Sequence, residues 1–239
     1  MENKNNFWFK EIDSGYYEKI LIDGLSSKKG LQSNWHNITY IKMKSYLKKG
    51  LTHLDYACGP GSLIGIYSDS NSIGFDIVDK QIQYAKNKYE KNNKSFTSER
   101  SNIQLVNYFD VITINGLFEY LTNEEIANLL NELKKYLKKN GIILITTPNY
   151  FGIFRLIEKI GQFIGGVNYS KVNINKFNVR KVNSLLKNLD IEKFEVSKFM
   201  NLGVLFSIFS HSFAYKVENL INKLFFGFFG MLLFIKIYK

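Results

Sequence analysis

Short apolar runs alternate with longer amphipathic stretches between residues 51 and 147, and this alternation is the strongest constraint on the fold. Apolar residues spaced three or four apart indicate helices at 62–68, 79–91 and 123–138. Between and around them lie runs that predict β-strands, at 51–57, 72–77, 95–97, 109–114 and 142–147. Strands and helices that alternate in this way form a parallel sheet with helices on both faces. Ligands bind such a sheet beyond the carboxyl ends of its strands.

The flanking segments add two further parts. Residues 7–49 predict helices that end at the basic turn Lys48-Lys49-Gly50. Beyond Pro148 the pattern predicts a cap over the strand ends at 151–176, a helix at 179–189, and strands at 191–198 and 231–238. We therefore divide the chain into an N-terminal helical lid (1–49), a ligand-binding core (50–150) and a cap that also completes the sheet (151–239).

Composition narrows the class of protein. The chain has 239 residues, of which 45% are hydrophobic, and this is enough for a buried core without disulfides. Cys58 is the one cysteine, so no internal disulfide can form. The first six residues are polar and do not resemble a secretory signal, which favours a cytoplasmic location. Three scattered histidines and one cysteine lack the spacing of metal ligands, so we expect no bound metal.

Positive charge is concentrated at the two ends of the chain. The formal charge is +11 overall, and it divides into +4 for residues 1–50, −1 for 51–150 and +8 for 151–239. Basic ends are typical of proteins that bind an anionic membrane or a nucleic acid. The chain is also rich in Lys, Asn and Ile throughout, so a general bias in composition explains the charge equally well.

The segment Leu54–Ser62 (LDYACGPGS) predicts a strand that turns through glycines directly into a helix. Such a turn presents backbone N–H groups and the positive helix end to a ligand, and glycine lets the ligand approach the main chain. The dinucleotide-binding fingerprint requires a third glycine where this chain has Ile64, and the Gly-Lys-Ser/Thr of phosphate loops is absent. The loop therefore favours a nucleoside-type ligand without a pyrophosphate.

Asp76 ends the next predicted strand, Ser72–Ile77. Nucleotide sites of α/β proteins place at this position a carboxylate that accepts hydrogen bonds from both ribose hydroxyls. The glycine turn and the acid occur in the expected register, which makes the pair more informative than either motif alone.

Two more segments follow in order, Phe109–Leu121 (FDVITINGLFEYL) and Leu133–Asn149 (LKKYLKKNGIILITTPN). With these, residues 50–150 resemble the class I S-adenosylmethionine-dependent methyltransferases, in particular the small-molecule branch that includes quinone-biosynthesis enzymes. The resemblance implies a Rossmann-like α/β fold with a seven-stranded, mostly parallel sheet and an antiparallel last strand. It also implies S-adenosylmethionine as the cofactor.

The resemblance assigns roles to individual residues of the cofactor site. Asp55 would organise the glycine loop and the amino end of the cofactor, and Gly59 and Gly61 would lie under its methionine and ribose portions. Asp76 would accept the ribose hydroxyls, and Ile77 would lie against the adenine.

The resemblance also places residues on the far side of that site. Glu99 would lie near the adenine amine, and Asn115 would face the sulfonium and the incoming substrate. Relatives often have Glu-His after the fourth strand, but this chain has Glu119-Tyr120, so no histidine base is present there. We interpret Cys58 as a small turn residue, because methyl transfer needs no covalent intermediate.

Methyl transfer from a sulfonium is an in-line displacement for which positioning supplies much of the rate. An acceptor hydroxyl would benefit from a general base, and the candidates are Glu119 and His36, which belongs to the N-terminal helical region. His53 and His211 lie among apolar residues in the sequence, so we expect structural roles for them.

Two apolar stretches near the C-terminus, 199–215 and 224–235, are 17 and 12 residues long. Neither reaches the roughly 20 residues that a membrane-spanning helix needs. One interpretation packs this region on the sheet, with Ala214, Val217, Ile221 and Leu224 as a helix stripe that faces the core. In the other, the aromatic residues of 199–226, with Lys216 and Lys223, form a surface for peripheral contact with anionic lipid or a lipid-linked acceptor.

The sequence thus predicts an S-adenosylmethionine-dependent methyltransferase that acts on a small-molecule or lipid-linked acceptor, in the cytoplasm or on the inner membrane face. An alternative is a catalytically inactive module, membrane-associating or regulatory, that retains the fold. RNA methylation is a third hypothesis, and the absence of a basic-aromatic RNA-binding module argues against a nucleic-acid partner.

Overall fold

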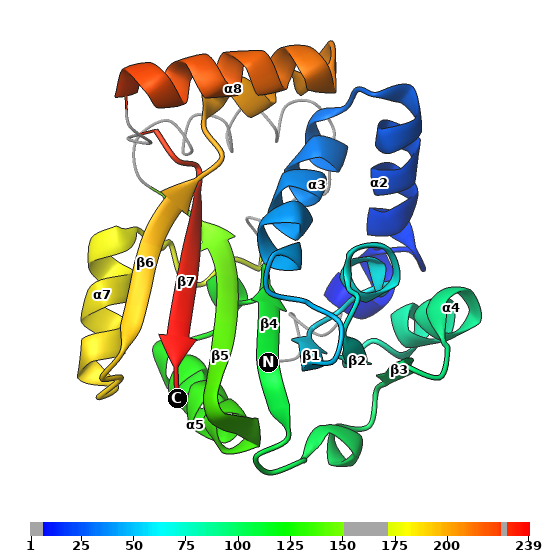
Figure 1. Cartoon of the computed structure of the whole chain (residues 1–239), viewed down its shortest axis with the longest axis vertical. Helices are drawn as coiled ribbons and strands as arrows, with labels where there is room; N and C mark the ends of the chain where they lie inside the picture. Colours follow the sequence, from blue (N-terminus) through cyan, green and yellow to red (C-terminus); the bar gives the residue numbers. More distant parts are fainter. Residues whose placement is uncertain (1–6, 151–171, 226–228) are drawn as a thin grey trace.

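A seven-stranded sheet organises the chain (Figure 1). The computed structural model describes residues 7–150, 172–225 and 229–239. The strand order is β3-β2-β1-β4-β5-β7-β6; β7 runs antiparallel to both β5 and β6, and the remaining pairs are parallel. The predicted fold class is therefore confirmed. The strands are β1 (Thr52–Tyr56), β2 (Asn71–Phe75), β3 (Lys94–Thr97), β4 (Phe109–Asn115), β5 (Leu137–Pro148), β6 (Phe194–Phe199) and β7 (Leu232–Tyr238).

Helices cover both faces of the sheet, and one lies across its end (Figure 1). The α-helices are α2 (Tyr16–Ser27), α3 (Leu31–Lys44), α4 (Asp79–Tyr89), α5 (Asn123–Tyr136), α7 (Val179–Asn188) and α8 (His211–Phe225). Shorter π- or 3-10-helical turns occur at Phe7–Glu11, Leu63–Tyr67, Arg100–Ile103, Phe118–Tyr120 and Leu202–Ile208. The helix predicted at 62–68 is therefore a single π-helical turn.

Alternation along the central strands directs their side chains to two separate cores. Leu54, Ile112 and Ile114 face α5 and α7, whereas Val111 on β4 faces α3. β4 and β5 bury apolar side chains on both faces, which is typical of the central strands of a parallel sheet. The carboxyl ends of β1, β2 and β4 are thereby held at one edge of a rigid layer.

The helix α5 begins where its sequence predicts. Thr122 accepts a hydrogen bond from the N–H of Glu125, whose side chain accepts one from the N–H of Thr122, so the two form a capping box. The apolar stripe of α5, including Ile126 and Leu133, is buried as predicted. Its last turn differs from the expectation, because the helix stops at Tyr136.

Strand β5 starts at Leu137, five residues before the predicted strand. Its pairing with β4 shifts register between Phe109 and Val111, and Asn140 adopts a left-handed backbone with φ of 69°. A Cβ on Gly141 would lie 2.9–3.1 Å from Leu137, Lys138 and Phe109 atoms. The missing side chain at Gly141 therefore allows β4 and β5 to approach closely at this irregularity in their pairing. Gly141 lies within β5 and does not end the preceding helix.

The turn Leu202–Ile208 and the helix α8 follow the carboxyl end of β6. Asn201 donates its backbone N–H to the Glu218 carboxylate at 3.3 Å and its side-chain amide to the Glu218 carbonyl at 2.8 Å, which holds α8 in place. Ala214 of α8 is buried, but Leu224 is 61% exposed. The prediction that Leu224 faces the core is therefore wrong, because α8 lies across the end of the molecule (Figure 1).

Part of the predicted cap, residues 151–171, lies outside the described residues. Beyond that gap, the N–H groups of Ile174 and Asn175 donate to the carbonyl of Glu119, in the turn Phe118–Tyr120 that follows β4. Across the described part of the chain, no helix combines the length and the apolar character that crossing a bilayer requires.

Candidate functional site

The loop after β1 has the tight backbone that its glycines predict. Gly59 and Gly61 have φ angles of +53° and +79°, and Ala57 also lies in the left-handed region at +64°. A Cβ on Gly59 would meet nothing within 4 Å, whereas one on Gly61 would collide with Phe96 and Ala85. Gly59 therefore borders open space where a ligand can approach the main chain, and Gly61 is required for packing beneath the loop.

Asp76 joins this loop to β2. Its carboxylate accepts the N–H of Gly59 at 2.8 Å and the N–H of Val78 at 2.9 Å. Burial raises the pKa of Asp76, and the two backbone hydrogen bonds act in the opposite direction. Each carboxylate oxygen can accept more than one hydrogen bond, so Asp76 keeps capacity for further donors.

Asp55 lies at the end of β1 and is 2% exposed. Thr113 on β4 donates its hydroxyl to Asp55 at 2.6 Å. Burial raises the pKa of Asp55 to about 7, the Thr113 hydrogen bond lowers it, and the charge of Asp76 raises it further. The two acids share one edge of the sheet, because Asp55 lies near the carboxyl end of β1 and Asp76 directly follows the neighbouring parallel strand β2.

The residues predicted to surround an adenine also follow the strand ends. Ile77 comes directly after Asp76 and is 54% exposed. Glu99 follows β3 and is exposed, and its backbone N–H donates to the Thr97 hydroxyl. The backbone N–H of Asp76 donates to the carbonyl of Thr97, so these segments lie side by side.

A second group of side chains lies at the carboxyl ends of β4 and β5 and in the turn after β4. Thr146 donates to the Asn115 side chain, and Thr147 donates to the Glu119 carboxylate at 2.9 Å. Glu119 is 4% exposed, and burial raises its pKa to about 7 against the opposing effects of its own backbone N–H and Thr147. A carboxyl group with this pKa exchanges its proton near neutral pH.

His36 on α3 lies among aromatic rings. It stacks on Tyr40 with ring centroids 5.9 Å apart and meets Tyr17 edge to face at 5.6 Å. Its Nε2 atom is buried without a hydrogen-bond partner among the described residues, and burial lowers its pKa to about 4. The charge of Asp55 is one of the causes that raise the pKa of Tyr40, so this aromatic cluster lies near Asp55. Among the described residues, no hydrogen bond, ion pair or ring contact joins His36 to Glu119.

Sequence reasoning missed Glu18 on α2. It is fully buried, accepts the Ser62 hydroxyl at 3.3 Å and forms an ion pair with Lys88 of α4. The contacts tie the N-terminal helices to the segment that follows the glycine loop. No motif marks Glu18, because its importance depends on which distant residues surround it.

Within the described ranges, no group of three or more His, Cys, Asp or Glu side chains is arranged to hold a metal ion. Cys58 is buried and its Sγ lies 3.6 Å from the Gly59 carbonyl, and burial raises the pKa of its thiol.

Comparison with known proteins identifies the class. Residues 47–160 match the family model described as a methyltransferase domain. A ribosomal protein L11 methyltransferase from Thermosipho melanesiensis is 27% identical in an alignment over 148 residues that covers 56% of this chain and 54% of that protein. The chain thus spans about half the length of that curated relative.

Solved structures share the fold over most of the chain. A SAM-dependent methyltransferase from Archaeoglobus fulgidus has a TM-score of 0.58 and 19% identity, and the match covers 85% of this chain and 94% of that one. The magnesium protoporphyrin IX methyltransferase of Synechocystis, solved with bound SAH, has a TM-score of 0.54 and 14% identity over 85% of this chain and 83% of its own.

The chain therefore contains a methyltransferase domain, and its sheet has the fold of the class I S-adenosylmethionine-dependent methyltransferases. The family predicted from the motifs is confirmed at this level. The quinone-biosynthesis branch and the roles of the individual site residues remain predictions.

Proposed function

We propose that this chain transfers a methyl group from S-adenosylmethionine to a small-molecule or lipid-linked acceptor by in-line displacement. The observation that carries the proposal is the convergence of Asp76 and Asp55 on the glycine loop, with Gly59 facing open space. When bound, the cofactor supplies a methyl carbon on a sulfonium, a very good leaving group.

The residues present fit this cofactor. Asp76 keeps acceptor capacity for ribose hydroxyls, and the exposed side chain of Ile77 offers an apolar surface to an adenine. Asp55 supplies an acid for the amino end, and Asn115 lies at the carboxyl end of β4, where the sulfonium and acceptor would meet. Glu99 at the end of β3 is proposed to lie near the adenine amine, and Gly61 holds the loop against Phe96.

Glu119 is the candidate general base. Its buried carboxyl and its raised pKa suit removal of a proton from an acceptor hydroxyl near pH 7. His36 remains a second candidate, because its buried Nε2 lacks a hydrogen-bond partner among the described residues. Burial lowers its pKa to about 4, which makes it the weaker base of the two. Positioning of the acceptor supplies the larger part of the rate in either case.

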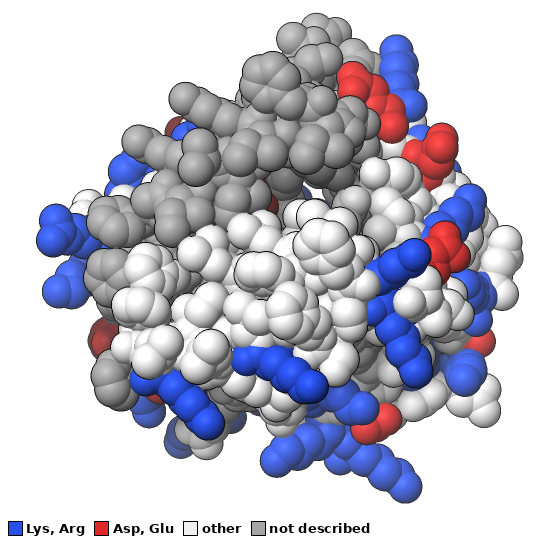
Figure 2. Space-filling model, turned by 90° about the horizontal axis from the view of Figure 1, so that it is seen from above, with Lys and Arg blue, Asp and Glu red and all other residues white. Residues whose placement is uncertain are grey.

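The lipid-linked form of the proposal draws support from α8. Apolar side chains along this helix and the turn before it are exposed, including 75% of Phe209. Figure 2 looks at this end of the molecule and shows a broad uncharged area bordered by Lys and Arg. The exposed apolar residues are Phe206, Ile208, Phe209, Phe213, Tyr215, Leu220, Leu224 and Phe225.

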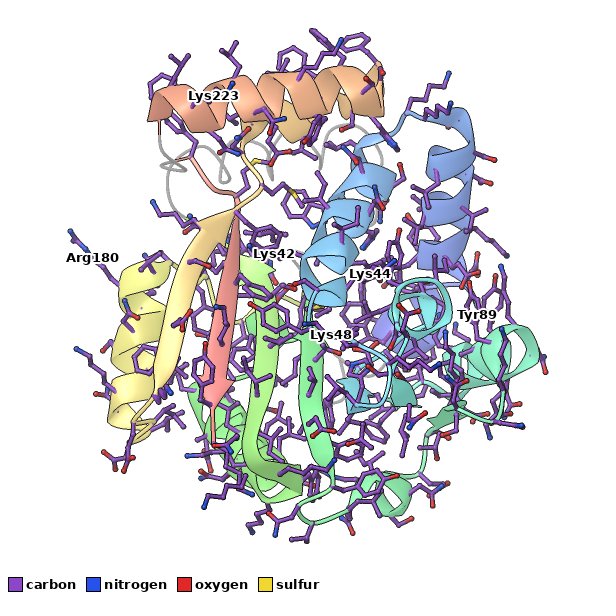
Figure 3. All side chains as sticks on the ribbon, viewed as in Figure 1. Lys42, Lys44, Lys48, Tyr89, Arg180 and Lys223 are labelled. Atoms are coloured by element: carbon purple, nitrogen blue, oxygen red, sulfur yellow. The ribbon has the colours of Figure 1, made fainter. Side chains whose placement is uncertain are left out.

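Spacing and charge make α8 amphipathic in the manner of an interfacial helix. Phe213, Leu220 and Leu224 fall on one stripe, with Lys216 and Lys223 beside it. Figure 3 shows Lys223 on α8, and Lys42 and Lys44 on α3 below it. A helix with this pattern binds an anionic membrane surface, and α8 lies at the end of the sheet where β6 ends, so peripheral contact would bring a lipid-linked acceptor toward the site.

The test of this function incubates the full chain with a bacterial cell extract and S-adenosylmethionine that is labelled on its methyl group. The extract is then divided into lipid, water-soluble small-molecule, protein and RNA fractions. Label in the lipid fraction supports a lipid-linked acceptor, and label in the small-molecule fraction supports a soluble one. Label confined to protein or RNA contradicts the proposal. Binding of the cofactor without transfer to any fraction supports the inactive alternative.

A further inference from the structure

A chain of hydrogen bonds inside the sheet ends on Asp55. His53 on β1 is fully buried, and both of its ring nitrogens have polar partners. Its Nδ1 lies 3.1 Å from the hydroxyl of Ser72 on β2, and its Nε2 lies 2.8 Å from the hydroxyl of Thr113 on β4. The expectation that His53 has apolar surroundings is therefore wrong.

The register of the strands creates this arrangement. His53 and Asp55 are two residues apart on β1 and point to the same face. Ser72 is the partner of His53 across the β1–β2 pair, and Thr113 is the partner of Asp55 across the β1–β4 pair. The Thr113 hydroxyl thus lies between the imidazole and the carboxylate.

Counting protons fixes the direction of every hydrogen bond while Asp55 is ionised. Thr113 has one hydroxyl proton and gives it to Asp55, so the Nε2 of His53 must donate to Thr113. Burial lowers the pKa of His53 to about 3, so the ring is neutral and its Nδ1 must accept from Ser72. Ser72 in turn accepts from Ser68, 3.0 Å away.

A protonated Asp55 reverses this order. Its carboxyl proton would go to Thr113, which would then donate to the Nε2 of His53, and the ring proton would move to Nδ1. Ser72 would accept that proton's hydrogen bond and donate to the carbonyl of Ser70, which lies 3.2 Å away. In both directions of the hydrogen-bond chain, every polar group in it has a partner. The tautomer of His53 therefore shows whether Asp55 is ionised or protonated.

We propose that His53 is a positioning residue for the cofactor site: through the Thr113 hydroxyl it holds Asp55 in its ionised, hydrogen-bonded state. The role in cofactor binding rests on the proposed function, in which Asp55 receives the cationic amino end of S-adenosylmethionine. The titratable groups that sense Asp55 from neighbouring elements are Tyr40 on α3 and Cys58 in the loop, and Asp76 after β2 acts on Asp55 itself.

The first test observes the tautomer directly in the wild-type chain. Labelled with ¹⁵N at histidine, His53 should be neutral with its proton on Nε2 at pH 9, and the proton should move to Nδ1 as the pH is lowered to about 5. His53→Gln identifies the resonances by their loss. A proton on Nδ1 at pH 9, or a tautomer that does not change with pH, overturns the proposed hydrogen-bond relay from His53 through Thr113 to Asp55.

The second test measures affinity for S-adenosylhomocysteine at pH 6 and pH 8. Glutamine can place a donor where Nε2 lies, whereas asparagine reaches only the Nδ1 position. His53→Gln should stay within threefold of wild type at both pH values. His53→Asn should bind at least tenfold more weakly at pH 6 and within threefold at pH 8. Equal losses for both variants at both pH values contradict the proposal and indicate a structural role alone.

Thr113 provides a second pair if a His53 variant does not fold. Thr113→Ser keeps the hydroxyl and should retain the wild-type pH profile, whereas Thr113→Val should show the loss at pH 6. An identical profile for the two Thr113 variants overturns the inference. A wild-type chain that binds no S-adenosylhomocysteine contradicts the proposed function, and in that case the tautomer measurement still decides the relay.

Discussion

Asp76 accepts a hydrogen bond from the backbone N–H of Gly59 at 2.8 Å, which ties the acid after β2 to the glycine loop after β1. The acid therefore shapes the loop as well as presenting a carboxylate to a ligand. These two roles of Asp76 explain why the glycine turn and the acid after β2 occur at the expected spacing along the chain.

Replacement of Asp76 by Asn should weaken binding of S-adenosylhomocysteine. The change removes the charge that accepts hydrogen bonds, and hydrogen bonds to charged groups contribute about 1–3 kcal/mol, so the dissociation constant should rise roughly 5- to 150-fold. Calorimetric titration measures it. Asp79→Asn, an exposed acid at the start of α4, is the matched control and should bind like wild type. Unchanged affinity in Asp76→Asn would refute the placement of the ribose.

Glu119→Gln should abolish the dependence of methyl transfer on a group with a pKa near 7. In the wild type, kcat should rise as the pH increases through about 7, because the carboxylate is the basic form. Loss of a general base typically lowers kcat about 10²- to 10⁴-fold. The control is Glu124→Gln, an exposed acid at the start of α5. A kcat–pH profile that is the same in Glu119→Gln and wild type would exclude Glu119 as the base.

Glu119 should also make stability depend on pH. Its pKa is raised in the folded state, so the folded chain holds this proton more tightly than the unfolded chain does. The contribution is complete below about pH 4 and is lost as the pH rises to about 7. Between pH 5 and pH 8, the unfolding free energy of wild type should therefore fall by about 2–3 kcal/mol more than that of Glu119→Gln. Urea denaturation at the two pH values measures this, and parallel losses in both proteins would contradict it.

The exposed stripe of α8 should mediate membrane contact. Replacing Phe213, Leu220 and Leu224 by Ser removes apolar side chains from water-exposed positions, so sedimentation with vesicles that contain anionic lipid should fall at least tenfold. Val106→Ser is the control, because Val106 is 68% exposed and far from α8 in the sequence.

Charge should modulate the same contact. Lys216→Gln together with Lys223→Gln should weaken binding to anionic vesicles and leave binding to neutral vesicles unchanged. Wild-type protein that does not sediment with either kind of vesicle would refute the membrane surface.

The sequence predicted the sheet because each strand and helix has a local pattern. Burial on both faces of β5 accounts for its continuous apolar run Ile142–Ile145, and α5 adds a capping box and an amphipathic stripe. The start of β5 could not be predicted, because Gly141 marks both a helix stop and a close approach of strands, and only the pairing with β4 distinguishes the two.

Asp55, Asp76 and Glu119 could be predicted as site candidates because each lies near or beyond the carboxyl end of a strand, within a recognisable motif. His53 and Thr113 could not, because their contact depends on the lateral pairing of strands 60 residues apart. The outward position of Leu224 also escaped prediction, since helical spacing identifies a stripe without telling which side of it meets the core.

Cofactor binding at the glycine loop is tested by calorimetric titration of the full chain with S-adenosylhomocysteine at pH 8. We expect saturable binding of one ligand per chain, weakened by Asp76→Asn and unaffected by Asp79→Asn. No saturable binding to the folded wild-type chain, or binding to which Asp76 makes no difference, would contradict this expectation.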